Sequence, residues 1–402
     1  MGSLSKSRNY RGYSSTDEED IIHEAEPWEI PNRTKKWLIT LGTLVAVCLL
    51  YMFCFLLPKT FIPETKELVG IHKAEPLDVI LTPVSSEKAN SWGLTTLEYD
   101  DFSDDDDEED EHDLRVSSDE EVNIESNSMK KSKERLILVG DAHGQYRELK
   151  KLLRKVKYKK ERDQLLVLGD FITKGPHSFK VLDFLIDNDI ACIMGNHEYY
   201  VLQNYATYHG LPQPFFVNGT APSFRTTGKF NSDPEFLLAK KLKPKHVEYI
   251  NNCPVMKELG QVPLHSKKNK GKYGHTEGVA VHAGLRMEFL KDLNAQDPED
   301  CLEMRSYIGP YYNETTDDPS DKGAVSWSKI WNQKQKAGEL DRSLVVYYGH
   351  DAGRGLKLKK FTKGLDSGCT KGGKLSALVM WQEKSKGSDK VMYKETLVQQ
   401  KC

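Results

Sequence analysis

The longest hydrophobic stretch of the chain lies close to its N-terminus and contains no charged residue. It covers residues 37–57 (WLITLGTLVAVCLLYMFCFLL), and 21 uncharged, mostly apolar residues are enough for a helix to cross the core of a bilayer. A cleaved signal peptide would begin nearer the N-terminus and end at a small-residue site, whereas here residues 1–36 come first and are polar. The pattern therefore predicts one transmembrane signal-anchor helix at residues 37–57, after a disordered tail at residues 1–36.

The charges beside this helix and two glycosylation motifs predict the side of the membrane on which the rest of the chain lies. Arg33, Lys35 and Lys36 crowd the N-terminal edge of the helix, and basic residues favour the cytosolic side. Two Asn-X-Thr motifs, at Asn218 and Asn313, lie beyond the helix and are acceptors for N-glycosylation in a lumenal or extracellular domain. We therefore expect a single-pass type II protein with a cytosolic tail and a lumenal body.

A different pattern begins at residue 134, where short apolar runs alternate with amphipathic or loop segments. Residues 146–158 and 178–185 carry apolar side chains at helical spacing, so the first part of the body predicts parallel strands joined by helices. Five runs end at an Asp, Asn or His: Leu136–Val139 before Gly140-Asp141, Leu165–Leu168 before Gly169-Asp170, Ile190–Met194 before Gly195-Asn196, Val279–Val281 before His282, and Leu344–Tyr348 before Gly349-His350. Because ligands gather at the carboxyl ends of such strands, we expect these side chains to meet in one site.

The side chains at these strand ends suit a pair of divalent cations. Two ions roughly 3.5–4 Å apart need a bridging carboxylate and oxygen or nitrogen ligands. We expect Asp170 to bridge, with Asp141 and His143 on one ion and Asn196, His282 and His350 on the other. A hydroxide shared by the ions would attack phosphorus in line. His197 would protonate the leaving oxygen as general acid, and Lys174 would hold the phosphoryl oxygens.

The segment between the apolar helix and residue 134 has the composition of a linker. Residues 104–111 are eight consecutive acidic residues, and such a block repels itself, so we expect a disordered acidic stalk at residues 58–133. Residues 1–133 carry a net charge of −14 and residues 134–402 one of +11, and a basic body suits an anionic substrate. The seven cysteines include no Cys-X-X-Cys pair, so a thiolate zinc site is not expected. One or two disulfides are compatible with a lumenal body, and the sequence leaves their pairing open.

Five ordered motifs in the body resemble the signature of calcineurin-like metallophosphoesterases, in the branch of phosphoprotein phosphatases and bacterial diadenosine tetraphosphatases. They are Gly-Asp-Ala-His-Gly (140–144), Gly-Asp-x-x-x-Lys-Gly (169–175), Gly-Asn-His-Glu (195–198), Val-His-Ala-Gly (281–284) and Gly-His-Asp (349–351), and residues 364–375 resemble a late strand region of the bacterial enzymes. The resemblance implies an α/β fold over residues 134–402, with a central β-sandwich of mixed sheets flanked by helices. It also implies a metal-dependent phosphohydrolase.

Two positions of the second motif depart from the phosphoprotein phosphatase pattern. Where those enzymes carry Asp-Arg-Gly, this chain has Thr173-Lys174-Gly175. The usual arginine is thus a lysine, which is a point charge rather than a bidentate fork, and the carboxylate that would orient His197 is a threonine. Both changes argue against a phosphoprotein substrate and suit a phosphoanhydride, whose leaving group is already a good one.

Together with the membrane anchor, the motifs are similar to those of fungal vacuolar, zinc-dependent endopolyphosphatases. This resemblance implies cleavage of inorganic polyphosphate in the vacuole lumen, with two divalent ions for which zinc is favoured over cobalt, manganese, iron or magnesium. Candidate substrate contacts are Arg147 and Arg354, followed by the lysines at 267, 268, 270, 272, 357, 359 and 360. Dinucleoside polyphosphates, capped RNA and phosphoproteins remain alternative substrates, and a membrane-tethered polyanion-binding scaffold is the non-enzymatic alternative. Few aromatic residues accompany the basic runs, so nucleic acid is not expected as a partner, and the oligomeric state stays open.

Overall fold

The structure of the protein is a computed structural model that describes residues 30–57, 64–98, 131–217, 232–265, 274–385, 387 and 390–402. It falls into two units, an N-terminal one that ends at Pro63 and a compact one that runs from Glu64 to Cys402. The expected tail, the acidic run at residues 104–111, the glycosylation motif at Asn218 and the lysines at 267–272 lie outside the described residues.

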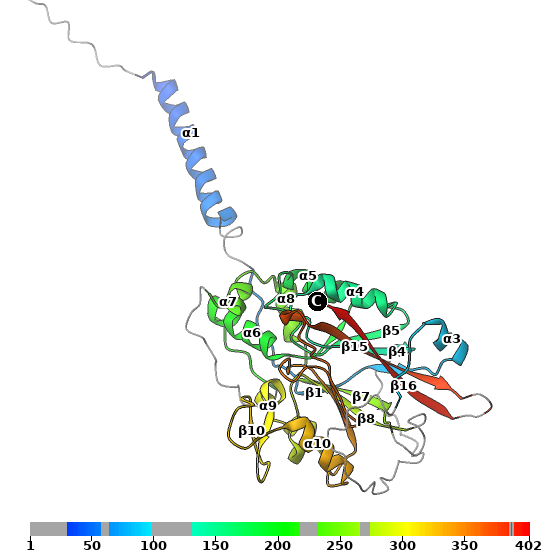
Figure 1. The fold of residues 1–402 in the computed structure, drawn as a ribbon. Helices are drawn as coiled ribbons and strands as arrows, with labels where there is room; N and C mark the ends of the chain where they lie inside the picture. Colours follow the sequence, from blue (N-terminus) through cyan, green and yellow to red (C-terminus); the bar gives the residue numbers. More distant parts are fainter. Residues whose placement is uncertain are drawn as a thin grey trace, which may run out of the picture. The chain divides into compact units, whose positions relative to one another are not determined.

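The described part of the N-terminal unit is one continuous helical segment (Figure 1). Helix α1 covers Asn32–Tyr51 and continues as a π-helical turn over Met52–Leu56. By length and composition these 25 residues could cross a membrane, and α1 buries none of its side chains. The structure confirms a helix here but begins it at Asn32 rather than at residue 37. Insertion into a membrane and its direction stay predictions.

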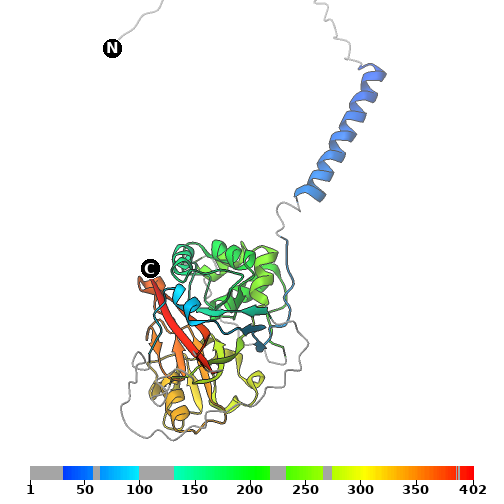
Figure 2. The ribbon, with the colours of Figure 1, turned by 90° about the vertical axis from the view of Figure 1, so that its right-hand side faces the viewer.

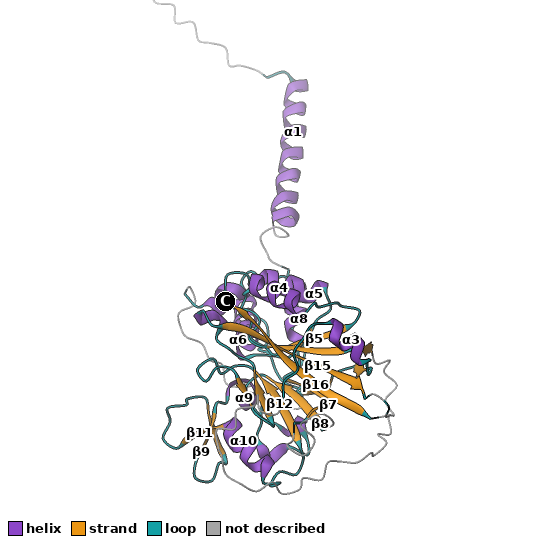
Figure 3. Ribbon diagram, turned by 45° about the vertical axis from the view of Figure 1, so that its right-hand side comes forward, coloured by secondary structure: helices purple, strands orange, loops and turns teal. Residues whose placement is uncertain are grey.

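The compact unit combines helices with two large and two small sheets (Figure 3). Its described α-helices are α3 (Ser86–Ser91), α4 (Tyr146–Lys155), α5 (Ser178–Asp187), α6 (Asn196–His209), α7 (Pro234–Ala239), α8 (Pro244–Asn251), α9 (Pro298–Glu303) and α10 (Trp327–Lys336). Its first strands are β1 (Ala74–Pro76), β2 (Val79–Leu81), β3 (Lys131–Lys133), β4 (Arg135–Val139), β5 (Asp163–Val167), β6 (Ala191–Cys192), β7 (Met256–Pro263) and β8 (His275–Val281). The later strands are β9 (Ser306–Ile308), β10 (Glu314–Thr316), β11 (Ala324–Ser326), β12 (Leu344–Tyr348), β13 (Lys357–Leu358), β14 (Thr362–Gly364), β15 (Lys374–Lys384) and β16 (Val391–Lys401).

The first large sheet has five strands in the order β16-β15-β4-β5-β6. Strands β4, β5 and β6 run parallel, and α4 and α5 connect them, as the sequence predicted. Helix α4 forms because Leu149, Leu152 and Leu153 fall on one face, where all three are buried. The antiparallel pair β15–β16 extends the sheet on the other side of β4.

The second large sheet has six strands in the order β1-β7-β8-β12-β14-β13 and is also mixed. Strands β8, β12 and β14 run parallel, whereas β7 pairs antiparallel with β8. Buried side chains from both large sheets belong to one hydrophobic core. Figures 1 and 2 show α4, α5 and α8 at one end of the body and α10 at the other. The expected α/β fold of mixed sheets flanked by helices is therefore confirmed.

Residues 64–98 correct the expectation of a disordered stalk over residues 58–133. Strand β1 pairs with β7 in the six-stranded sheet, and β2 pairs with β3. Trp92 is buried, with its ring 5.6 Å from that of Trp381 and 4.8 Å from the guanidinium of Arg135. The acidic block dominates the composition of this segment, whereas single apolar residues carry its packing: Ile71, Leu77, Val84, Ala89 and Trp92. The folded body therefore begins before residue 134.

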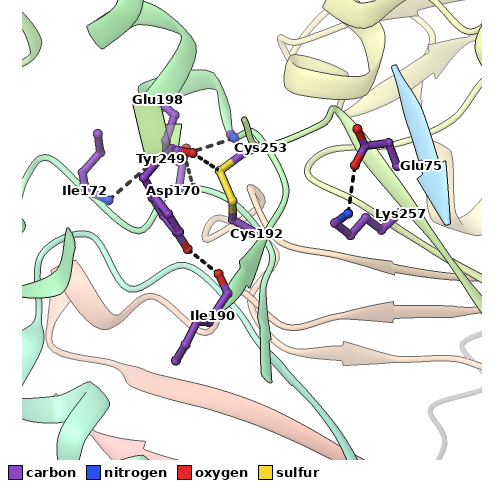
Figure 4. Close-up of a disulfide and its surroundings, with 10 residues drawn as sticks. Glu75, Asp170, Ile172, Ile190, Cys192, Glu198, Tyr249, Cys253 and Lys257 are labelled. Atoms are coloured by element: carbon purple, nitrogen blue, oxygen red, sulfur yellow. Dashed lines mark hydrogen bonds and ion pairs between the residues drawn. A yellow bond between two sulfur atoms is a disulfide. The ribbon is translucent and has the colours of Figure 1, made fainter. Parts of the chain in front are cut away.

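Two disulfides, which the sequence left unpaired, fasten segments close to the strand ends of interest. Cys192 at the end of β6 is bonded to Cys253, which lies just before β7 (Figure 4). Cys369 is bonded to Cys402, the last residue of the chain. The first bond braces the segment that leads into Asn196, and the second braces the loop after β14.

Candidate metal centre

The strand ends selected from the sequence converge in the structure. Asp141 and His143 follow β4, Asp170 follows β5, Asn196 and His197 open α6 after β6, His282 follows β8, and His350 follows β12. The backbone φ angles of His143, Asp170 and His350 are 40°, 47° and 67°. Such left-handed conformations are uncommon for residues with a side chain and are held in place by their surroundings. They mark the sharp turns that aim these side chains into one cluster.

Asp170 lies at the centre of the cluster, and its two carboxylate oxygens face different neighbours. Oδ2 lies 3.5 Å from Nε2 of His143 and 3.8 Å from Nε2 of His197. Oδ1 lies 3.3 Å from Nε2 of His282. Two sets of side chains lie close enough together to hold a metal ion, namely His143, Asp170 and His197, and Asp170, His282 and His350. His197 keeps the role expected from the sequence, that of an acid beside the first ion, so His143 and Asp170 are the ligands that the first set contributes. Asp170 belongs to both sets, as a bridging carboxylate must.

Three of the histidines are fixed by a backbone carbonyl at the ring nitrogen that points away from the other ligands. The carbonyl oxygens lie 3.2 Å from Nδ1 of His143, 2.8 Å from Nδ1 of His282 and 3.0 Å from Nε2 of His350, and belong to Ile172, Leu168 and Glu303. Because a carbonyl only accepts hydrogen bonds, that nitrogen carries a proton, and the other nitrogen is the one that could offer a lone pair to an ion. Histidines that bind metals are commonly oriented in this way.

Asp141 and Asn196 are placed beside the second set. Both oxygens of Asp141 accept a hydrogen bond from the backbone N–H of His350, at 3.2 and 3.0 Å. Oδ1 of Asn196 lies 3.1 Å from Nε2 of His282. A Cβ atom at position 349 would lie 2.0 Å from Oδ1 of Asp141, so this close approach requires Gly349. The structure thus brings Asn196, His282 and His350 together as expected, while Asp141 contacts the His350 turn and its pairing with His143 on one ion stays a prediction.

Glu198, part of the third motif but given no role from the sequence, holds the turn that carries Asp170 (Figure 4). Its Oε2 accepts hydrogen bonds from the backbone N–H groups of Asp170 at 2.6 Å and Gly195 at 3.1 Å. Its Oε1 accepts one from Ile172 at 3.1 Å. Burial, followed by the charge of Asp170, raises the pKa of Glu198 to about 7. One buried carboxylate therefore joins the strand ends of β5 and β6.

The electrostatics of the cluster call for additional positive charge. Burial and the neighbouring Asp366 raise the pKa of Asp141 well above its ordinary value. Burial opposes ionisation of His282, but Asp170 and Asp141 outweigh it and raise the pKa of His282 to about 10. Burial likewise disfavours the charge on Asp170, whose pKa is nevertheless held well below its ordinary value by His282, His197 and His143. Divalent ions would supply this positive charge, and carboxylates, imidazoles and an amide are donors that suit them. The residues present therefore fit a metal centre.

Lys174 reaches the cluster from the loop between β5 and α5. Its Nζ lies 3.2 Å from Nε2 of His143. Thr173 and Lys174 have φ angles of 65° and 51°, and a Cβ atom at Gly175 would lie 2.0 Å from the carbonyl oxygen of His143. The loop therefore passes directly against His143, which is compatible with the predicted role of Lys174 at the phosphoryl oxygens.

The other candidate substrate contacts are placed less simply. Arg147 is exposed in the first turn of α4. Arg354 donates hydrogen bonds to Oδ2 of Asp351 at 2.5 Å, to the carbonyl oxygen of Arg305 at 3.1 Å and to Oγ of Ser306 at 2.9 Å. These bonds give Arg354 a structural role at the start of β9, and its contact with substrate stays a prediction. Lys359 is predicted to contact the phosphates of the substrate, but its side chain is buried rather than exposed on the surface.

Three charged residues near the cluster were missed in the sequence. Oε1 of Glu235 lies 2.6 Å from Nδ1 of His197, Asp366 interacts with Asp141, and Arg305 is close enough to contribute, after burial and His282, to the lowered pKa of His350. Asp366 lies within residues 364–375, which the resemblance already covered, so it could have been found. Glu235 and Arg305 lie outside every motif, and no local signal pointed to them.

The fold and this cluster define a class of protein, the metal-dependent phosphohydrolases. Residues 134–354 match the family model for calcineurin-like phosphoesterases. This match spans more than half of the chain, and the protein belongs to that family.

Individual relatives fall into more than one branch of the family. The zinc-dependent endopolyphosphatase of Saccharomyces cerevisiae is 28% identical over 280 residues, which is 66% of this chain and 80% of that protein. The symmetrical bis(5'-nucleosyl)-tetraphosphatase of Psychromonas ingrahamii is 24% identical over 274 residues, which is 61% of this chain and 93% of that protein. A solved structure provisionally assigned as a diadenosine tetraphosphatase is 25% identical, with a TM-score of 0.45, and the match covers 66% of this chain and 94% of that one.

Proposed function

We propose that the protein hydrolyses the phosphoanhydride bonds of inorganic polyphosphate within the polymer, as a zinc-dependent enzyme of the vacuole lumen anchored by α1. The main evidence for a two-metal reaction is the position of the Asp170 carboxylate, which faces His143 and His197 with one oxygen and His282 with the other. Support for polyphosphate comes from the relative in Saccharomyces cerevisiae, whose name states that activity, and from the basic character of residues 134–402.

The metal ions and the residues around them would have distinct roles in the reaction. Two divalent ions, when bound, would activate water and stabilise the charge that develops on the phosphoryl group. Asp170 keeps the two sets of ligands in register because its backbone N–H is bonded to Glu198 and its Oδ1 accepts a bond of 3.2 Å from the N–H of His197. His197 presents Nε2 on the same side, where it can give a proton to the leaving oxygen. Lys174 places a positive charge beside His143, where it can hold phosphoryl oxygens.

Two features of the body support a lumenal location. The bonds Cys192–Cys253 and Cys369–Cys402 are typical of oxidising compartments. Asn313 of the second glycosylation motif is exposed, just before β10. A shift in mobility on endoglycosidase treatment that is lost in Asn313→Gln would support this topology, and an unglycosylated Asn313 in the native host would argue against it.

A substrate panel tests the proposed activity. The full-length protein in detergent, supplied with zinc, cobalt, manganese or magnesium, is incubated with long-chain polyphosphate, diadenosine tetraphosphate or a phosphoserine peptide. We expect polyphosphate to be shortened through intermediate lengths on a gel, with the highest kcat/KM of the three substrates. Polyphosphate that stays intact with every ion would refute the proposal, and release of orthophosphate alone from the chain ends would refute internal cleavage.

Diadenosine tetraphosphate is the second candidate substrate. The relative in Psychromonas ingrahamii, which is named for a symmetrical bis(5'-nucleosyl)-tetraphosphatase activity, aligns with the chain over 93% of its own length. The same panel separates the two, because an enzyme of that kind would favour the dinucleotide over polyphosphate in kcat/KM.

A further inference from the structure

His197 differs from the other histidines of the cluster in the group that holds its ring. The rings of His143, His282 and His350 rest on backbone carbonyls. Nδ1 of His197 instead lies 2.6 Å from a side-chain carboxylate, Oε1 of Glu235. The carboxylate accepts a hydrogen bond from Nδ1–H, so Nε2 is the nitrogen presented to the cluster, where it lies 3.8 Å from Oδ2 of Asp170.

Glu235 is held in this position by its own segment of the chain. It lies in the first turn of α7, which packs beside α6 (Figure 1). Oδ1 of Asp233 caps the helix by accepting hydrogen bonds from the backbone N–H groups of Glu235 at 2.9 Å and Phe236 at 3.2 Å. The side chains of Glu235 and His197 are 12% and 15% exposed. Because helix α7 is capped and the Glu235 side chain is largely buried, its carboxylate has little freedom to move away from the imidazole.

Phosphoprotein phosphatases carry the carboxylate that orients this histidine in the second motif, but the residue at that position here has no carboxylate to offer His197. Thr173 stands at that position, and its buried Oγ1 has no hydrogen-bond partner among the described residues. The loop around Thr173 is fixed by other contacts, since its backbone N–H donates to Oγ of Ser178 at 3.0 Å. The imidazole thus receives its carboxylate from a segment 38 residues further along the chain than His197, rather than from the second motif.

We propose that Glu235 is a positioning residue that takes over this task and fixes the ring and tautomer of His197 for proton donation from Nε2. The inference rests on the proposed function only in requiring a hydrolysed P–O bond. In that step the oxygen of water forms the new bond to phosphorus and releases one proton to solvent, while the bond to the leaving oxygen breaks. The leaving oxygen takes the Nε2 proton of the imidazolium, and the neutral imidazole keeps its Nδ1 proton, still hydrogen-bonded to Glu235. A proton from solvent restores Nε2–H before the next turnover. Helix α7, which lies between the third and fourth motifs, thereby helps to position the catalytic acid.

The experiment compares the full-length wild type with Glu235→Ala, Glu235→Gln, His197→Ala and the double variant His197→Ala/Glu235→Ala. Each is assayed on 4-nitrophenyl phosphate and on 2,4-dinitrophenyl phosphate, whose leaving group needs little protonation, and on polyphosphate. For 4-nitrophenyl phosphate we expect Glu235→Ala to lower kcat about 10–100-fold, by analogy with the loss of the carboxylate partner of a metal-bound histidine, with KM little changed. Glu235→Gln retains more activity because its amide oxygen still accepts a hydrogen bond from Nδ1–H. The dinitrophenyl ester is hydrolysed at nearly the wild-type rate, and the double variant is no slower than His197→Ala.

Two readouts do not depend on turnover. Metal content by elemental analysis should be the same in wild type and Glu235→Ala, because Glu235 orients an acid rather than a ligand. A downfield imidazole N–H proton resonance should be present in the wild type and absent from both Glu235→Ala and His197→Ala. Glu314→Gln, an exposed site on β10, serves as the control.

Several results would overturn the inference. They are wild-type kcat in Glu235→Ala, an equal loss on both aryl esters, an additive loss in the double variant, a lost equivalent of metal, or an unchanged N–H resonance. Failure of the proposed function would look different. In that case polyphosphate stays intact in the wild type, while the aryl esters and the N–H resonance still report on Glu235.

Discussion

Replacing Trp92 by alanine tests whether residues 64–98 are a folded part of the body rather than a tether. The indole is 4% exposed, its ring lies 5.6 Å from that of Trp381, and the guanidinium groups of Arg135 and Arg162 lie 4.8 and 5.5 Å from its centroid. Truncating a buried tryptophan costs about 3–5 kcal/mol. At the usual unfolding entropy per residue, a body that runs from Glu64 to Cys402 loses about 1.4 °C in Tm for each kcal/mol, so we expect a fall of roughly 4–7 °C.

The catalytic constants should respond much less than the melting temperature. Arg135 begins β4 and Asp141 follows its other end, so the two are about 20 Å apart along the chain at the usual rise per residue. We expect kcat within about twofold of wild type at 20 °C, because the strand end itself is not in contact with Trp92.

The assay is thermal unfolding of the full-length protein in detergent, with hydrogen exchange measured on peptides from residues 86–98. Tyr311→Ala, which removes a ring that is 85% exposed, is the matched control. In the wild type the peptides should be protected from exchange, and in Trp92→Ala they should exchange quickly. An unchanged Tm together with fast exchange of these peptides in the wild type would show that the segment does not dock, and the fold described for it would be wrong.

Three further predictions concern the cluster itself. Lys174→Met should lower kcat/KM about 10²-fold, as loss of an electrophilic group does, while Lys174→Arg should retain part of the wild-type kcat/KM. A lowered Tm with wild-type kcat/KM would show that Lys174 is only structural. Glu198→Gln turns an amide NH₂ toward a backbone donor and should cost about 1–3 kcal/mol of folding free energy, by chemical denaturation; no loss would contradict the contacts at Asp170. Chelation of bound metal should lower the Tm, because an ion present at 100 times its Kd adds about 2.7 kcal/mol to the free energy of unfolding. Scanning calorimetry with and without EDTA measures this change, and an unchanged Tm would show that the protein holds no ion.

Much of the site could be predicted because its residues sit at the ends of strands with a simple apolar pattern. The runs before Asp141 and Asp170 are buried strands flanked by amphipathic helices, so both the local structure and its periodicity point to the same edge of a sheet. The structure confirms these strands and brings Asp170 and the four histidines together. These ligands can be predicted because each one directly follows an apolar run that is recognisable in the sequence.

The parts that could not be predicted depend on contacts between distant segments. Trp92 is one aromatic residue in a polar, acidic region, and its burial against Trp381 depends on a partner almost 300 residues away in the chain. Glu235 has the local sequence of an ordinary helix start, Asp-Pro-Glu, and becomes relevant only because α7 packs on α6. Composition averaged over residues 58–133 also concealed the docked segment, because the acidic block outweighed a few isolated apolar residues.

The bridging role of Asp170 is the central claim, and metal titration of Asp170→Asn tests it most directly. The full-length wild type and the variant are stripped of metal, titrated with zinc by calorimetry and assayed for polyphosphate shortening, with Asp341→Asn, which lies on the surface, as the matched control. We predict two equivalents of zinc for the wild type and the control, and loss of tight binding at both positions together with loss of turnover for Asp170→Asn. Two equivalents of tightly bound zinc and near-normal turnover in Asp170→Asn would contradict the account.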